Sequence, residues 1–414
     1  MKRFYLIALL VCGALVYNCT DETPEPAPAP VTPSTSDYIL TAEVTNMASG
    51  GVEVNNQTHE VTIFLRANAE RNRVRIKFVL APGVTMVFPP SAEADYDLTT
   101  ASTVLIKAGD TSTEYRITAS LQFVNPETIG WTKVTGMGSL KNGISVYKAP
   151  DQMQGKNAQA YIAVGDINKG ITFDVLGEPS GYKTPTQFYN SSGRMYPIVI
   201  NGGYFASNIS LSMIWRNGVL VTPNIQVDWR NDRQMYPMWS VFGRVADKVY
   251  RADWVYSIPP NNVTYAYPYP LPYTEYTQPS ESYPAGAWPY EAITAIGAGP
   301  TLIKNGYRTP SSSWDAENFD VSSGIGPNSS NPRTAIGITG DGKLILFVCE
   351  GRNKTPNTPG YSFGEMANIL MELGCMEAIN LDGGGSSCML VNGNETIKPS
   401  DGTQRTVASA VGLR

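Results

Sequence analysis

The sequence has one histidine, His59, among 414 residues, and we expect this residue to lie outside the catalytic region. Without a histidine at the site, a Ser-His-Asp triad, a Cys-His pair and histidine-ligated zinc or iron are all excluded. The chemistry must then depend on carboxylates, arginines, amides, hydroxyls and backbone N–H groups. A bound metal would have to be an oxygen-liganded ion such as Ca²⁺ or Mg²⁺, but no cofactor and no metal ligand is indicated.

Charged side chains are also scarce, at 16% of the chain, and the net charge is −5 with a pI near 5.2. This argues against nucleic acid as a partner, since a phosphate backbone is bound by a basic surface. The chain is rich in glycine (38), proline (30) and hydrophobic residues (42%). Such a composition is typical of a turn-rich and strand-rich globular protein, and the length suggests roughly two to three domains.

Cysteines are few and give no metal motif. Cys12 and Cys19 lie in the N-terminal leader, so Cys349, Cys375 and Cys388 remain. Three is an odd number, and at most one disulfide can form, for which Cys375 and Cys388 are the possible pair. Cys349 lies in an apolar run, and we expect a buried free thiol there.

The first residues are typical of an exported protein. Met1 to Arg3 are positively charged, and the apolar run from Phe4 to Tyr17 is too short to span a bilayer. We predict a lipoprotein signal peptide over residues 1–18, lipidation at Cys19 and a Pro/Thr-rich tether over 19–36. The protein would then be an outer-membrane or cell-surface lipoprotein that contacts the membrane through its lipid alone. The alternative is simple cleavage and secretion, because the residue before Cys19 is unusually large for a lipobox.

Residues 37–124 predict a β-sandwich. Apolar and polar residues alternate over 61–65 and 74–78, which is the pattern of strands with one wet face. About seven short strands in this length favour an immunoglobulin-like sandwich. The segment resembles the small spacer domains of Bacteroidetes surface lipoproteins. His59 falls here, where we expect a strand-edge residue.

Residues 130–414 predict a larger mixed α/β domain with a β-rich sheet and few helices, which makes the whole chain α+β. One helix is well marked, with Ser362 and Glu365 as a capping box and Gly374 at its end. It lies between apolar strands at 343–349 and 378–381, which predicts a right-handed, parallel β-α-β unit.

A segment from Tyr256 to Tyr290 has eight tyrosines and eight prolines. Proline removes ladder donors and breaks helices, so we expect no regular strand or helix here. The segment could form an aromatic wall for a sugar, but a long loop that packs its tyrosines on the body is the favoured interpretation.

Three glycine-rich loops follow apolar strands, at residues 201–205, 350–352 and 382–387. Such loops let backbone N–H groups approach an anion. Asp341-Gly342 is a strong hairpin signal, and pairing Gly340 with Lys343 would bring Arg333 opposite Glu350.

Glu350 and Asp382 would both emerge at the carboxyl ends of parallel strands. We therefore expect Arg333, Glu350, Arg352 and Asp382 to meet at one edge. This group suits an anionic, hydroxylated substrate, and a structural cluster of salt bridges is the alternative.

Six ordered motifs indicate a family. They are Asn201–Phe205, Gly299–Gly306, Asn331–Gly337, Glu350–Arg352, Leu373–Cys375 and Ala378–Ser387. Together they resemble the phosphodiester glycosidase family over about residues 130–414. Glu350 departs from the family pattern, which usually has Asp there, and residues 256–290 look like an insertion.

The resemblance implies cleavage of the sugar C1–O–phosphate bond of a sugar-1-phosphodiester, giving a free sugar (N-acetylhexosamine-like) and a phosphomonoester. A phosphate leaving group is weakly basic, so no histidine is required. Arg333 and Arg352, with the amides of Gly383 to Gly385, would hold the phosphate. Asp382 or Glu350 would be the nucleophile or base, and the other the acid or stabiliser.

The remaining predicted residues would bind substrate. They are Asn201, Gly202, Gly203, Phe205, Thr334, Gly383, Gly384, Gly385, Ser386, Ser387 and Arg405. Two alternatives to this enzyme stay open at this stage. One is a non-catalytic glycan-binding surface lipoprotein, and the other is a Ca²⁺-dependent site that uses Asp382 and Glu350.

Overall fold

The computed structural model describes residues 37–47, 49–65, 69–230, 232–272, 276–320 and 323–414. The predicted signal peptide, Cys19 and the tether lie outside the described residues. Within those residues, no helix has both the length and the apolar character needed to cross a membrane.

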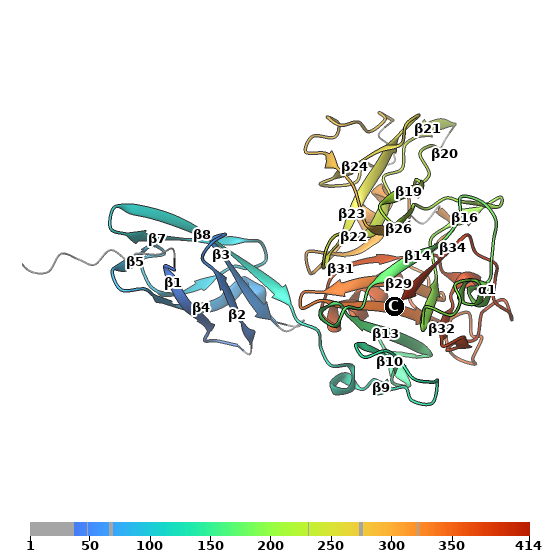
Figure 1. The fold of residues 1–414 in the computed structure, drawn as a ribbon, viewed down its shortest axis with the longest axis horizontal. Coiled ribbons are helices and arrows are strands. Elements are labelled where there is room, and N and C mark those ends of the chain that lie inside the picture. Colours follow the sequence, from blue (N-terminus) through green and yellow to red (C-terminus); the bar gives the residue numbers. More distant parts are fainter. Residues whose placement is uncertain (1–36, 48, 66–68, 231, 273–275, 321–322) are drawn as a thin grey trace, which may run out of the picture.

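The first described body is a β-sandwich, drawn in blue to cyan in Figure 1. Its described residues form eight strands in two sheets that pack on one apolar core. One sheet has the order β1 (Ile39–Val44), β4 (Val74–Leu80), β6 (Glu93–Tyr96). The other has the order β2 (Ser49–Asn55), β3 (Glu60–Leu65), β8 (Thr111–Leu121), β7 (Ser102–Ala108), β5 (Val84–Phe88).

Alternation along these strands explains the sandwich. Val61, Ile63 and Leu65 are fully buried, while Arg75 and Lys77 of β4 point to solvent, as the period of two requires. His59 lies in the turn before β3, and its ring contacts Tyr115 at 5.1 Å between centroids. The immunoglobulin-like classification stays a prediction.

The larger body follows from about residue 130 and holds three main sheets. The eight-stranded sheet has the order β28 (Tyr307–Arg308), β27 (Thr301–Lys304), β31 (Cys375–Asn380), β29 (Arg333–Thr339), β30 (Lys343–Cys349), β13 (Ala160–Asp166), β10 (Ile144–Lys148), β9 (Thr132–Lys133). The seven-stranded sheet has the order β19 (Val219–Thr222), β18 (Ile214–Arg216), β26 (Thr294–Ala298), β22 (Ser240–Ala246), β23 (Val249–Ile258), β24 (Val263–Tyr267), β25 (Trp288–Pro289). The five-stranded sheet has the order β14 (Phe173–Gly177), β34 (Ser409–Leu413), β15 (Ile198–Asn201), β32 (Met389–Val391), β33 (Asn394–Glu395).

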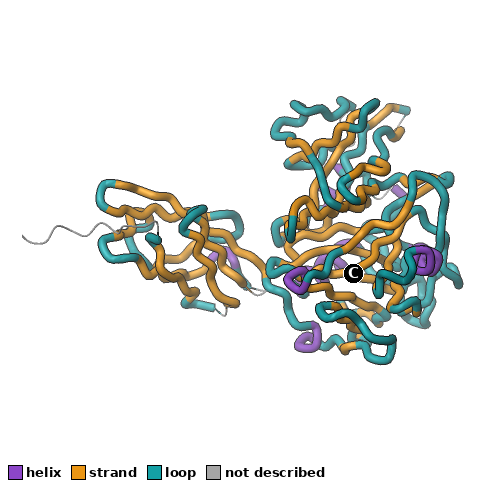
Figure 2. The backbone as a smooth tube through the Cα atoms, in the orientation of Figure 1, coloured by secondary structure: helices purple, strands orange, loops and turns teal. Residues whose placement is uncertain are grey.

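Short strand pairs and a few helices complete this body, and strands dominate it in Figure 2. The pairs are β11 (Gln152–Met153) with β12 (Lys156–Asn157), β16 (Phe205–Ala206) with β17 (Ile209–Ser210), and β20 (Asp228–Arg230) with β21 (Arg233–Met235). The α-helices are α1 (Pro185–Ser191), α2 (Ser311–Ala316) and α3 (Phe363–Glu372). The described 3-10 turns are Pro126–Ile129, Ile167–Lys169 and Gly384–Ser386 here and Arg71–Arg73 in the sandwich. Buried side chains from all three main sheets and from α3 share one core.

Helix α3 forms as its sequence predicts. Ser362 and Glu365 make both hydrogen bonds of the capping box, and Gly374 follows the last turn with φ +91°. Met366, Ile369 and Leu370 are buried against the core. The predicted helix is confirmed.

The strands around α3 run as predicted but are not neighbours. β29 pairs antiparallel with both β30 and β31, so β30 and β31 are parallel to each other with β29 between them. Their carboxyl ends therefore meet at one edge of the sheet, together with the start of β29.

The predicted register of the hairpin is wrong by one residue. Arg333 pairs with Cys349, and Ile338 pairs with Leu344. Gly340 lies outside the ladder, and its N–H donates to the Leu121 carbonyl of the sandwich at 2.9 Å. Paired residues share a face and successive residues alternate, so Glu350 points away from the face of Arg333.

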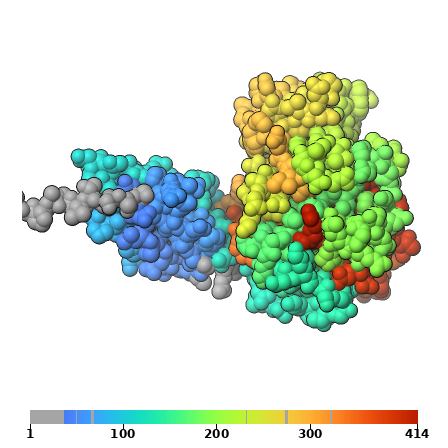
Figure 3. Space-filling view, in the orientation of Figure 1, coloured from blue at the N-terminus to red at the C-terminus, as the bar shows by residue number. Residues whose placement is uncertain are grey.

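The sandwich is attached to the larger body by several contacts beside this hairpin. The N–H of Val124 donates to Leu373 at 3.2 Å, and the N–H of Phe123 donates to Asp341 Oδ1 at 3.0 Å. Arg71 donates to the Gly306 carbonyl at 2.6 Å. Figure 3 shows two bodies that meet over a limited area in this view.

The tyrosine- and proline-rich segment contains strands, which corrects one prediction. The end of β23, all of β24 and the short β25 lie within residues 256–290. Tyr256, Tyr267 and Tyr290 are buried, so these tyrosines do pack onto the body. The three cysteines of the described chain are all free and buried, and the possible Cys375–Cys388 disulfide does not form.

Candidate active site

A small polar pocket of about 150 Å³ lies at the edge where β29, β30 and β31 meet their loops. Its lining comes from separate segments of the chain: Tyr204, Gly324, Ile325, Asn331, Arg333, Arg352, Asp382, Gly383, Gly384, Gly385 and Arg405. Seven of these lining residues were predicted as site residues, and the lining brings three guanidinium groups around one carboxylate.

Asp382 follows β31 and is held by its own main chain. Its N–H donates to the Gly202 carbonyl at 3.1 Å, and its carbonyl accepts from Asn201 Nδ2 at 2.6 Å. The carboxylate Oδ1 accepts from the Gly383 N–H at 2.9 Å. The side chain is thereby directed into the pocket from a rigid strand end.

The electrostatics of Asp382 suit proton exchange near neutral pH. Protein surrounds the carboxylate except on its pocket side, and this desolvation raises its pKa to about 6. Ser386, Arg405 and the Gly383 N–H act in the opposite direction and lower the pKa. The Ser386 hydroxyl favours the charged form of Asp382. Its oxygen is buried and has no hydrogen-bond partner of ordinary geometry among the described residues.

Asn201, Thr334 and Ser387 are buried behind the pocket and do not line it. Asn201 Oδ1 accepts from Thr334 Oγ1 at 2.8 Å and from the Cys388 N–H at 3.1 Å. With both ends of its amide engaged, Asn201 positions the Asp382 loop. Its predicted contact with sugar hydroxyls has no support from this geometry.

Gly202 and Gly203 also act through the main chain. A Cβ on Gly203 would lie 2.2 Å from the Gly297 carbonyl, and one on Gly202 would lie 2.3 Å from Ser409 Oγ. Only glycine fits these positions, because the chain after β15 passes close to β34 at Ser409 and to β26 at Gly297.

Arg352 and Arg405 are the two guanidinium groups with donors available to a ligand. Arg352 donates through Nε to Asn331 Oδ1 at 3.3 Å, and Arg405 pairs with Asp401 through Nε and one terminal nitrogen at 3.0 and 2.5 Å. Both side chains lie against the glycine loop: a Cβ on Gly384 would lie 3.0 Å from Arg352, and one on Gly385 would lie 2.3 Å from Arg405 and 2.1 Å from the Asp401 carboxylate that pairs with it. The loop and the two arginines thus form one cationic cradle.

Arg333 lines the pocket, but its guanidinium mainly organises the surrounding loops. Nε donates to the Tyr361 carbonyl at 2.9 Å, and the terminal nitrogens donate to the carbonyls of Ile325, Gly326 and Ser329 at 3.3, 2.6 and 2.9 Å. Burial lowers its pKa to about 10, so it stays charged at neutral pH. Its contribution to a bound anion is mainly its positive charge.

Two of the three predicted loop amides are already used. The Gly383 N–H donates to Asp382 Oδ1, and the Gly384 N–H donates to the Pro332 carbonyl at 2.9 Å. Among the described residues, the Gly385 N–H has no acceptor. It is the loop amide that can face a ligand.

Glu350 does not line the pocket. Its Oε2 accepts from the Thr355 N–H at 3.1 Å, and its Oε1 accepts from the Lys398 N–H at 2.9 Å. The side chain is 4% exposed. The one-residue register shift explains this position, and the geometry favours a structural role in place of the predicted catalytic one.

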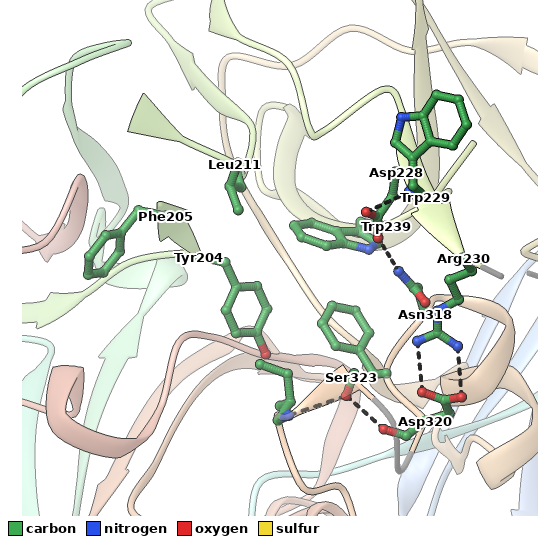
Figure 4. Close-up of a pocket in the computed structure, with 12 residues that line it drawn as sticks. Tyr204, Phe205, Leu211, Asp228, Trp229, Arg230, Trp239, Asn318, Asp320 and Ser323 are labelled. Atoms are coloured by element: carbon green, nitrogen blue, oxygen red, sulfur yellow. Dashed lines mark hydrogen bonds and ion pairs between the residues drawn. The ribbon is translucent and has the colours of Figure 1, made fainter. Parts of the chain in front are cut away.

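A second, larger pocket of about 740 Å³ adjoins the first, and Tyr204 and Ile325 line both. Its inner wall is aromatic, and Figure 4 shows Tyr204 and Trp239 facing this space. The rings of Tyr204, Trp239 and Phe319 lie 5.3 to 5.6 Å apart between centroids. Phe205, a predicted substrate-binding residue, lines this pocket.

Tyr204 connects the two pockets and was not predicted as a site residue. Its hydroxyl donates to the Gly299 carbonyl at 2.8 Å and accepts from Asn380 Nδ2 at 2.7 Å. Desolvation, and then Asp382, raise its pKa well above the ordinary value, so it is neutral. The sequence signal that could have identified Tyr204 was its place inside the Asn201–Phe205 motif. Asn331 also lines the small pocket and was not predicted, and its signal was its place beside Arg333.

No group of three or more His, Cys, Asp and Glu side chains that could hold a metal ion occurs within the described ranges. Since Glu350 does not share the pocket with Asp382, the pair does not form the oxygen cage that a Ca²⁺ site needs.

The chain belongs to the phosphodiester glycosidase family, whose profile matches residues 195–414. The resemblance read from the motifs is confirmed. Residues 130–194 precede the match, but their strands share its sheets and core.

Curated relatives match over a short stretch. The N-acetylglucosamine-1-phosphodiester alpha-N-acetylglucosaminidase of Mus musculus is 40% identical over 77 residues, which cover 19% of this chain and 14% of that protein. The Homo sapiens protein of the same name is 42% identical over 72 residues, which cover 17% and 13%. An uncharacterized prophage-derived protein of Bacillus subtilis is 36% identical over 84 residues, which cover 20% and 13%. The chain thus spans about one seventh of the length of these relatives.

Solved structures are similar over longer stretches. The zebrafish N-acetylglucosamine-1-phosphodiester alpha-N-acetylglucosaminidase catalytic domain, auto-inhibited by its pro-peptide, has 19% identity and a TM-score of 0.45, and the match covers 69% of this chain and 88% of that one. A hypothetical protein from Synechocystis has 15% identity and a TM-score of 0.46, with coverages of 90% and 80%.

Proposed function

We propose that the protein hydrolyses the C1–O bond of a sugar-1-phosphodiester and releases a free sugar and a phosphomonoester. The observation that supports this most is the small pocket, in which Asp382 faces Arg352 and Arg405 beside a larger aromatic pocket. Phosphate suits the cationic side, and a sugar ring suits the aromatic side. The N-acetylglucosamine named for the family's mammalian relatives makes an N-acetylhexosamine the first sugar to test.

The arginine cradle supplies the charge stabilisation. As the C1–O bond breaks, its electron pair passes to the phosphate oxygen, and the product is a phosphomonoester with a second pKa near 6. Arg352, Arg405 and the Gly385 N–H lie where this charge develops. A group that leaves as a stable anion needs no proton from a general acid, which fits a pocket without a second carboxylate among the described lining residues.

Asp382 acts at the anomeric carbon of the sugar. As that carbon develops oxocarbenium character, the ionised carboxylate stabilises it and acts as nucleophile, or as the base that takes a proton from water. The water oxygen finally bonds to C1. Tyr204, neutral and fixed between the pockets, positions the ring beside this carboxylate.

The leader sequence supports an exported protein. We propose a lipid anchor at Cys19 and a tether that presents the two bodies at the cell surface, where polymeric phosphodiesters are accessible substrates. Globomycin treatment of expressing cells should leave the uncleaved precursor, and Cys19→Ala should prevent labelling with a palmitate analogue.

Product analysis tests the activity directly. The protein is incubated with N-acetylglucosamine 1-(methyl phosphate) in ¹⁸O-labelled water, with and without EDTA. Cleavage of the C1–O bond places the label in the sugar and leaves methyl phosphate unlabelled. Label in the phosphate would mean P–O cleavage, and the absence of turnover with persistent binding would favour a glycan-binding protein instead. NMR of the first-formed anomer separates retention from inversion.

A further inference from the structure

Strand β20, which pairs with β21 in a hairpin, forms the outer wall of the large pocket and carries an exposed tryptophan. Trp229 lines this pocket and is 65% exposed. In Figure 4 its indole lies at the outer end, away from the inner group around Tyr204 and Trp239. A large ring at such a position has no packing role in the core.

The hairpin is fixed to the opposite wall, which holds this indole in place. Arg230 and Asp320 form a bidentate pair with both N···O distances at 2.8 Å, and each side chain is only 14% exposed. Asn318 Nδ2 donates to Asp228 Oδ2 at 2.8 Å. A platform that folding has already ordered loses little further freedom when a ligand binds.

The large pocket offers more room than one sugar needs. Its 740 Å³ lies in the upper part of the range of about 300–1,000 Å³ found for pockets that enclose drug-sized ligands. A single pyranose ring is smaller than such ligands, and the group of Tyr204, Trp239 and Phe319 can contact one ring. Trp229 and its hairpin then remain available to contact a second sugar ring.

The wall also has unused hydrogen-bonding capacity. Asn318 Oδ1 and Trp239 Nε1 are buried and have no partner among the described residues, and both side chains line the large pocket. Polar atoms left in this state cost stability and are typical of functional sites. Both atoms are covered in this conformation, so they mark the wall as polar without being contacts of the subsite proposed here.

From these observations we propose that Trp229 is the stacking platform of a second carbohydrate subsite. The substrate is then a sugar-1-phosphodiester whose sugar carries at least one further sugar residue. This inference rests on the proposed function, because it places the reacting sugar in the inner part of the large pocket. The chemistry of recognition is an apolar pyranose face on the indole, with Asp228 beside it to accept from hydroxyls.

The test compares matched substrates. One is N-acetylglucosamine 1-(methyl phosphate), and the others carry one more N-acetylglucosamine on each free hydroxyl in turn. For at least one extended substrate, we expect Trp229→Ala to lower kcat/KM about tenfold. The short substrate should change less than twofold. Trp229→Phe should restore most of the loss, since it keeps an aromatic face.

Phe88→Ala is the matched control, because Phe88 is also 65% exposed but lies in the sandwich. It should leave both substrates unchanged. An equal loss on short and extended substrates, or no loss on any extended one, would overturn the proposal. A loss confined to substrates with a bulkier alcohol on the phosphate would overturn it too, since the large pocket would then hold the leaving group.

Binding separates this inference from the proposed function. Calorimetry with free N-acetylglucosamine disaccharides needs no hydrolysis. If the protein hydrolyses none of the phosphodiesters but binds a disaccharide through Trp229, the proposed function fails and the subsite stands. If the wild-type protein hydrolyses the phosphodiesters and Trp229→Ala is equally active on all of them, the proposed function stands and the subsite fails.

Discussion

Two loops that look alike in the sequence have different fates in the structure. Each follows an apolar strand, begins with a carboxylate and continues with glycine: Asp382 after β31, and Glu350 after β30. Asp382 keeps a side open to the pocket, whereas both oxygens of Glu350 accept from backbone N–H groups. The difference teaches that a carboxylate at a strand end can face a ligand only when the main chain leaves at least one of its oxygens available.

Neutralising Asp382 should affect the chemistry more than the stability of the fold. Asp382→Asn should lower kcat about 10³-fold or more. Because burial already penalises the charge of Asp382, the free energy of unfolding should stay equal or rise. Initial rates and urea unfolding measure both. A folded variant with more than a tenth of the wild-type turnover would remove Asp382 from the mechanism.

The second largest effect on activity is expected from the cationic cradle. Arg352→Ala should lower kcat/KM about 10²-fold, since it removes a guanidinium that lines the small pocket and that would stabilise the phosphate charge in the proposed reaction. Arg352→Lys should recover only part of this, because a point charge lacks the fork geometry. Arg73→Ala, an exposed arginine of the sandwich, is the control. Equal activity of Arg352→Ala and Arg73→Ala would show that the phosphate binds elsewhere.

Glu350→Gln should affect the fold more than the chemistry. The amide must turn an NH₂ group toward a backbone N–H that now donates to Glu350, which costs about 1–3 kcal/mol of unfolding free energy. The folded variant should keep kcat within a few-fold. Glu372→Gln, an exposed glutamate on α3, should change stability by less than about 0.5 kcal/mol. A stable Glu350→Gln protein without turnover would restore the catalytic role.

The pH profile gives the smallest and most specific test. Burial raises the pKa of Asp382 to about 6, so the carboxylate is ionised above that pH and protonated below it. As base or nucleophile, it should give kcat/KM a limb that falls below about pH 6. Arg405 lowers this pKa, so Arg405→Ala should move the limb to higher pH. A limb that moves to lower pH, or none at all, would contradict the assignment.

Much of the site could be predicted because it lies in short motifs at the ends of strands or in the loops between them. The motif around Asp382, the arginines at 333, 352 and 405 and the glycine loop all line one pocket. Asn201 and Glu350 could not be assigned, because their hydrogen bonds go to residues far away in the sequence, such as Asp382 and Lys398. The large pocket was missed for the same reason. Its walls combine segments near residues 204, 229, 239 and 319.

Patterns in the sequence alone determined the helix at 363–372 and the alternation of the sandwich strands, which depend on residues a few positions apart, and the family of the chain, which depends on a series of short motifs. The register of the β29–β30 hairpin became visible only in the tertiary structure, where the Gly340 N–H donates to Leu121 of the sandwich and Arg333 pairs with Cys349. A shift of one residue turns every side chain to the other face, and that shift separated Glu350 from the pocket that Asp382 occupies.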